Sequence, residues 1–157
     1  MSIRAFAFIA GLLYVGAGIL GFIPPIVFPP PINAPPLIVD SNYGYLFGLF
    51  PINVLHNIVH IGIGVWGLLA ARDRVRARFF AMSLAVSYGL LAVLGLLPQA
   101  HTLFGFVPLF GHDVWLHALT AVISSYFGFL APADSILIRR ADTGTPNVKV
   151  YEERPGP

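Results

Sequence analysis

PINVLHNIVHIGIGVWGLLAARDRVRAR, residues 51–78, is the stretch of sequence that decides the fold. Its first part, 51–71, is mostly apolar and matches the roughly 20 residues that a helix needs to cross the hydrocarbon core of a bilayer. Two histidines and two asparagines nevertheless lie within its first three turns. An unpaired imidazole or amide in hydrocarbon costs several kcal/mol, so these side chains are expected to face the interior of a helix bundle.

The composition of the whole chain also predicts a membrane protein. Of its 157 residues, 57% are hydrophobic and only 10% are charged, and the mean hydropathy is +0.79. A soluble domain keeps roughly a quarter of its residues charged, so we predict an integral protein of the lipid bilayer. The absence of cysteine excludes disulfides and cysteine-ligated clusters. Despite a pI of about 9.2, no nucleic-acid partner is expected, because the basic residues lie at the ends of apolar segments.

Four apolar segments have the length of membrane spans. The predicted spans are about residues 3–23, 51–71, 79–97 and 113–132. We therefore predict an all-α polytopic membrane protein, with four transmembrane helices in one bundle (1–135) and a polar tail (136–157). Lysine and arginine are missing from the connections 24–50 and 98–112 but gather in 72–78 and after the last span. By the positive-inside rule, both termini and the connection 72–78 are cytoplasmic.

Further patterns concern packing, loops and the tail. Small residues on the first two spans predict that these helices pack closely inside the bundle. These residues are Ala7, Gly11, Gly18, Gly64 and Gly67. The prolines in 24–36 predict an extended, polyproline-like connection rather than a helix. The polar tail predicts disorder when it is alone, and the first span is expected to remain in place, since it is longer than the core of a usual signal peptide.

Polar residues recur at helical spacing on two of the predicted spans, so each set shares one helix face. On the second span they are Asn53, His56, Asn57 and His60, and on the fourth they are Asp113, His117, Thr120 and Ser124. The predicted topology makes both helices start at the outer surface and run parallel. Equal counts from the two starts then place His56 level with His117, and His60 lies about 6 Å deeper.

Three interpretations of this polar cluster remain open. The first is a zinc, iron or manganese ion, because imidazoles at i and i+4 hold one ion from a single helix. The second is a haem held by a histidine from each helix, or a magnesium tetrapyrrole held by one histidine. The candidate metal ligands are His56, His60, Asp113 and His117, and the candidate cofactor ligands are the same three histidines.

The third interpretation is purely structural. Hydrogen bonds between buried amides and imidazoles join membrane helices, at about 1 kcal/mol or less for each bond. Asp113 opens an apolar run after a glycine, so it is also a candidate N-cap of the last helix. A network of this kind would be supported by Asn53, Asn57 and Thr120.

Two stretches, LFPINVLHNIVHIGIGVWGLLAAR and GHDVWLH, resemble an uncharacterised bacterial membrane family known only as a domain of unknown function, widespread in actinobacteria and cyanobacteria. The resemblance covers about residues 5–132, and its most specific part is N-x-x-H-N-x-x-H followed by D-x-x-x-H. It implies a four-helix domain in a bacterial plasma membrane or thylakoid membrane. The shared polar positions that it implies are Asn53, His56, Asn57, His60, Asp113 and His117. It implies no activity.

Two classes of function are weighed. The first is a small accessory or binding subunit of a larger membrane complex, with other membrane subunits as partners, which the small soluble mass favours. The alternative is a small metal-dependent membrane enzyme or redox protein, with a site of three histidines and Asp113. The enzyme ranks second, because the chain offers no acid, base or nucleophile set beyond these same residues.

Overall fold

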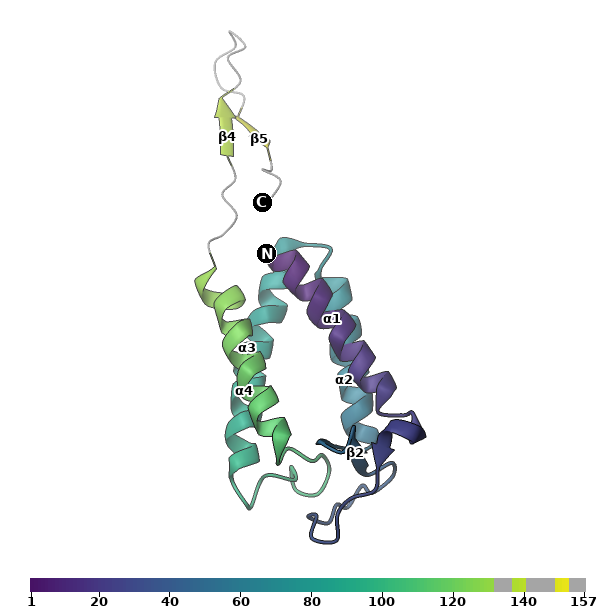
Figure 1. The fold of residues 1–157 in the computed structure, drawn as a ribbon. Helices are drawn as coiled ribbons and strands as arrows, with labels where there is room; N and C mark the ends of the chain where they lie inside the picture. Colours follow the sequence, from purple (N-terminus) through teal and green to yellow (C-terminus); the bar gives the residue numbers. More distant parts are fainter. Residues whose placement is uncertain (132–136, 141–148, 153–157) are drawn as a thin grey trace.

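The computed structural model describes residues 1–131, 137–140 and 149–152 (Figure 1). Its main elements are four helices that run alternately up and down. They are α1 (Ile3–Leu20), α2 (Val54–Ala70), α3 (Arg74–Leu96) and α4 (His112–Ser125), the last continued by a π-helical turn, η2 (Tyr126–Leu130). Figure 1 shows that α2 and α4 start at the same end of the bundle and run in the same direction, as the sequence predicts.

Three of the helices in the described chain are long and apolar enough to cross a membrane. They are Ile3–Leu20, Arg74–Leu96 and the continuous stretch His112–Leu130, and α2 is a shorter apolar helix of 17 residues. The protein is therefore mostly helical with membrane-like helices, and three of the four predicted spans meet the length of a span.

Two helix starts differ from the predicted ones. The second helix begins three residues late, because Pro51 lies in a strand and Asn53 is the N-cap. The third begins five residues early, since Asp73 caps it by accepting a hydrogen bond from the backbone N–H of Arg76 at 2.9 Å. The arginines of 74–78 consequently lie on the first turns of α3 rather than in a loop.

The connection between α1 and α2 forms a small sheet that the sequence did not predict. Its strands are β1 (Val27–Phe28), β2 (Gly44–Leu46) and β3 (Phe50–Ile52), antiparallel in the order β1-β2-β3, preceded by a 3₁₀ turn, η1 (Pro24–Ile26). Strands of two or three residues are too short to show an alternating pattern in sequence. The 3₁₀ turn shows that the expectation of an extended, non-helical connection is wrong for Pro24–Ile26. The sheet lies at the end of the bundle where α2 begins (Figure 1).

The tail contains a second pair of strands. β4 (Leu137–Arg140) pairs with β5 (Lys149–Glu152) in antiparallel register, from Leu137 opposite Glu152 to Arg140 opposite Lys149. The predicted disorder of the tail does not apply to these strands. The rest of the predicted tail, residue 136 with 141–148 and 153–157, lies outside the described residues.

The helices pack as two close pairs, α1 with α2 and α3 with α4. A Cβ atom on Gly64 would lie 2.5 Å from the backbone nitrogen of Val15, and one on Gly11 would lie 2.7 Å from that of Leu68. Backbone therefore meets backbone between α1 and α2, and only glycine fits, as the predicted small-residue faces require. The apolar core joins both pairs at the arginine-bearing end of the bundle, where the rings of Phe6 and Phe127 stack at 4.6 Å.

Candidate functional site

Buried polar side chains gather on the first turns of α2 and along α4. Those among the described residues are Asn53, His56, Asn57, Asp113, His117 and Ser124. Because α2 and α4 start at the same end of the bundle and run parallel, residues at equal distances from the two starts lie at similar depths. The sheet closes this end, since β3 leads directly into α2 and also packs against α4.

Asn53 anchors the start of α2 to both outer connections. Its Oδ1 accepts a hydrogen bond from the backbone N–H of His56 at 2.9 Å. Its Nδ2 donates to the carbonyl oxygens of Val39 at 2.8 Å and Phe106 at 2.7 Å. Both amide hydrogens are thereby used, so Asn53 ties the start of α2 to the two outer connections.

Three of the four candidate metal ligands converge. One ligand atom each from His56, Asp113 and His117 lies within 4.8 Å of the other two. The closest measured pair is His56 Nδ1 and Asp113 Oδ2, which are 3.7 Å apart. These two atoms and His117 Nδ1 are buried and have no hydrogen-bond partner among the described residues. Unsatisfied buried polar atoms are rare in folded proteins, so these three atoms are available to a metal ion, another ligand or an ordered water.

The fourth candidate, His60, stands beside this group rather than in it. Its ring stacks on that of His56, with centroids 4.5 Å apart and an interplanar angle of 18°. The ring of Tyr14 on α1 also stacks on the His60 ring, with centroids 5.3 Å apart and an interplanar angle of 22°. The spacing i, i+4 correctly places both histidines on one face, but the two rings lie face to face instead of aiming at one point.

The capping interpretation of Asp113 is wrong. The N-cap of α4 is Gly111, at a φ of 68° that favours glycine, and no side chain caps this helix. Asp113 lies two residues further on, and only 3% of its surface is exposed. A buried carboxylate costs several kcal/mol unless a positive charge accompanies it. Residues 5–71 and 79–138 contain no lysine or arginine, so an ionised Asp113 would need a protonated histidine or a bound cation as its counter-charge within these helices.

The predicted supporting residues Asn57 and Thr120 have different surroundings. Asn57 packs against the end of α1, where a Cβ atom on Gly21 would overlap its amide, and neither amide atom has a partner in the described part of the chain. Thr120 belongs to a cluster of hydroxyls, because Tyr14 lies within hydrogen-bonding reach of both Thr120 and Tyr88. Asn57 therefore packs against the end of α1, and Thr120 lines the same cavity as Asp113 and His117.

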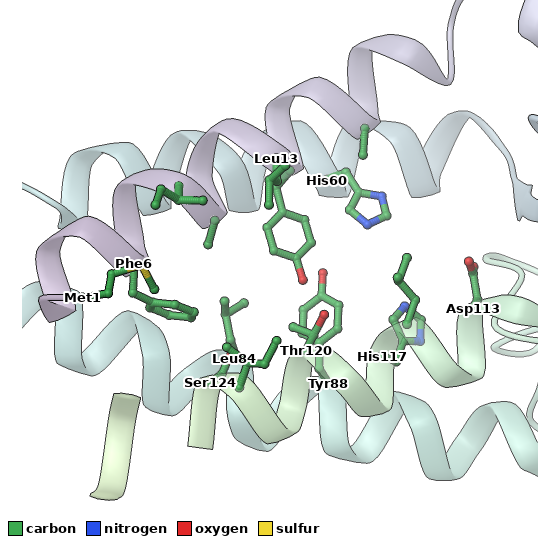
Figure 2. A pocket seen from close by; sticks show the side chains of 16 residues that line it. Met1, Phe6, Leu13, His60, Leu84, Tyr88, Asp113, His117, Thr120 and Ser124 are labelled. Atoms are coloured by element: carbon green, nitrogen blue, oxygen red, sulfur yellow. The ribbon is translucent and has the colours of Figure 1, made fainter. Parts of the chain in front are cut away.

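A cavity of about 480 Å³ adjoins the ligand cluster. Figure 2 shows His60 and His117 on opposite walls, with Tyr88 and Thr120 between them and the apolar end of the cavity. Sequence reasoning placed Ser124 on the polar face of the last helix but did not place Tyr14 or Tyr88 in the site. Their only signal is a hydroxyl on an otherwise apolar helix, and this does not reveal which hydroxyls meet across a bundle.

The donor set suits a divalent transition metal. Two imidazole nitrogens and one carboxylate oxygen are ligands that zinc, iron and manganese all accept. Three protein ligands also leave coordination positions open, which is the pattern of zinc sites that bind a water or a substrate. The distances between ligand atoms in a tetrahedral zinc site are about 3.3 Å, from bonds of about 2.0 Å. The cluster would therefore contract slightly around an ion.

Comparison with known proteins adds a family and no activity. No curated protein and no solved structure matches the chain. The model of a family described as a domain of unknown function, DUF4383, matches residues 4–130. This match confirms the resemblance to an uncharacterised family and contains every residue of the ligand cluster. The chain accordingly belongs to the DUF4383 family of domains of unknown function.

Proposed function

We propose that this chain is an integral membrane protein that binds one divalent transition-metal ion between α2 and α4. The ligands in this proposal are His56, Asp113 and His117. The observation that carries it is the convergence of three buried ligand atoms that have no other partner among the described residues. A network that only joined helices would instead satisfy these atoms with hydrogen bonds, since that is its source of stability.

The orientation in the membrane belongs to the same proposal. All four helices span the bilayer, including α2, whose 17 residues extend about 26 Å against a hydrocarbon core of about 30 Å. The start of α1, the α2–α3 turn and the end of α4 lie at one end of the bundle (Figure 1). Arg4 and the arginines of 72–78 are at this end, which supports a cytoplasmic location for it. The metal site then lies in the outer half of a bacterial plasma or thylakoid membrane.

The test is elemental analysis of the full chain purified in detergent. We expect about one zinc, iron or manganese ion per chain, and loss of that ion when His117 is replaced by alanine. The matched control is His112→Ala, which removes an exposed histidine next to Asp113 but outside the cluster. A folded chain that carries no metal and takes up none of the three ions on titration would overturn the proposal. A Soret or chlorin absorption band would replace it with a tetrapyrrole site.

A role as a subunit of a larger membrane complex is the second candidate. Gly62 faces outward on α2, and a Cβ atom placed on it would meet nothing within 4 Å. It leaves a gap among large exposed apolar side chains such as Ile58 and Val65, and such gaps let a helix of another subunit approach closely. We expect one dominant complex in mild detergent that Gly62→Leu disrupts while leaving the chain folded. Migration of the unmodified chain as a free monomer would count against this role.

A further inference from the structure

The cavity beside the metal cluster opens sideways, toward the surroundings of the bundle. Its walls come from all four helices, but Leu13 of α1 and Leu116 and Ile123 of α4 line it and are also exposed. The opening therefore lies between α1 and α4. In a membrane, side chains at this position face acyl chains rather than water. A ligand would enter the cavity from the lipid.

The polar groups inside the cavity are almost all uncharged. None of the residues that line it is lysine or arginine, and Asp113 is the only carboxylate. Tyr88 and Thr120 line the cavity between His117 and its apolar end (Figure 2), and their hydroxyls lie within hydrogen-bonding reach of the Tyr14 hydroxyl. Ser124, which is 1% exposed, lines the cavity as well, and its Oγ has no hydrogen-bond partner in the described part of the chain. Apart from the amino group of Met1, which belongs to the end of the cavity far from His117 (Figure 2), the cavity thus offers several hydrogen-bond donors and no lysine or arginine.

In the metal-free chain, the depth of these groups disfavours a charged head group. His60 is six residues beyond the start of α2, about 9 Å along the helix. A phosphate or carboxylate buried at this depth would need a cation, and without a bound ion the lining supplies no lysine or arginine to provide one. A neutral ring with carbonyl acceptors needs only the donors that are present. The ring faces of Tyr14 and His60 and the adjoining Tyr88 supply flat contacts for it.

We propose that this lateral cavity binds a neutral, lipid-soluble quinone, with its ring carbonyls on Tyr88, Thr120 and the neighbouring imidazole of His60 and its apolar tail in the opening between α1 and α4. The volume of about 480 Å³ lies within the range of about 300–1,000 Å³ typical of small-molecule sites. The inference goes beyond the metal site: Asp113 and His117 line the cavity and are also metal ligands, but the proposed contacts on Tyr88, Thr120 and His60 involve none of the three ligands.

The test is calorimetric titration of the purified full chain with a decyl-tailed benzoquinone, compared with decylbenzene, which has the same tail but no carbonyls. We expect saturable binding of the quinone at one site per chain and at least tenfold weaker binding of decylbenzene. Tyr88→Phe and Thr120→Val should each weaken quinone binding roughly five- to tenfold, since each removes about one hydrogen bond. The matched control is Tyr126→Phe, which changes an exposed tyrosine outside the cavity.

A second pair of variants tests the cavity without touching the donors. Ala17→Phe fills the wall of the cavity on α1 and should abolish binding, whereas Val86→Phe enlarges an exposed side chain on α3 and should leave binding unchanged. Equal binding of quinone and decylbenzene, or unchanged binding in both hydroxyl variants, would overturn the proposal. Repeating the titration after chelation separates the two sites, because quinone binding that survives metal removal leaves this inference standing even if no ion binds.

Discussion

Replacing Asp113 by asparagine has opposite expected effects on stability with and without a metal ion. Asparagine keeps the shape of the side chain and removes its charge. The Asp113 carboxylate is almost fully buried, and its Oδ2 accepts no hydrogen bond from the described residues. Its nearest candidate counter-charge, His56 Nδ1, is 3.7 Å away, which is too far for a hydrogen bond. Without metal, an ionised carboxylate at this position destabilises the folded chain, and with metal it stabilises the folded chain as a ligand.

The magnitudes follow from these two states. An ionised carboxylate buried without a partner costs up to several kcal/mol, and a neutral amide of the same shape avoids this cost. We therefore expect Asp113→Asn to raise the free energy of unfolding of the metal-free chain by up to this amount. A ligand at 100 times its Kd stabilises the folded state by about 2.7 kcal/mol. The original chain should gain about this much on adding metal, and the variant should gain much less.

Thermal unfolding in detergent measures both effects through the fluorescence of Trp66 and Trp115. A change of about 1 kcal/mol corresponds to a shift in Tm of roughly 2–4 °C for a chain of this size. Asp40→Asn is the control, because Asp40 is exposed in the outer connection. A variant that is less stable than the original chain without metal, and equally stabilised by metal, would refute both the charge argument and the ligand assignment.

Three further predictions concern the frame around the site. Gly64→Ala should lower the free energy of unfolding by about 1–3 kcal/mol, because the new Cβ meets the backbone of α1. Chemical unfolding measures this change, with Gly62→Ala as the control because a Cβ at Gly62 on the same helix meets open space. Asn53→Ala should cost about 2–4 kcal/mol in the same assay and speed proteolysis of the outer connections, since it removes a helix cap and two hydrogen bonds. Burial raises the pKa of Tyr43 from 10.0 to about 12, so the stability contributed by the buried neutral phenol should be complete below pH 10.0 and be lost as the pH rises through about 12. Phenolate absorbance of the original chain, compared with that of Tyr43→Phe, measures this titration, and identical titration curves for the two chains would contradict the prediction.

Much of the frame follows from the sequence because its causes are local. A helix in hydrocarbon needs about 20 apolar residues, and polar residues three or four apart share a face. These two rules place the four helices and put His56 and His60 on one face of α2. The glycines of α1 and α2 also indicate their close packing, because only a residue without Cβ lets two backbones touch.

The tertiary structure decided which of these polar residues act together. The polar face of α2 offers two histidines, yet only His56 converges with Asp113 and His117, because His60 stacks between His56 and Tyr14. The prediction that Asp113 caps α4 was wrong, since Gly111, two residues earlier, is the N-cap of this helix. The small sheet likewise left no readable pattern in its short strands.

The sequence by itself determined that this protein is helical, suited to a membrane, and polar on one face each of α2 and α4. Only the tertiary structure decided that two histidines and one carboxylate meet and that a cavity with neutral donors opens between α1 and α4. Hydropathy and helical period are properties of neighbouring residues in one segment. The convergence of ligand atoms depends on how four separate helices rotate and approach one another, and that is set by packing between residues far apart in the chain.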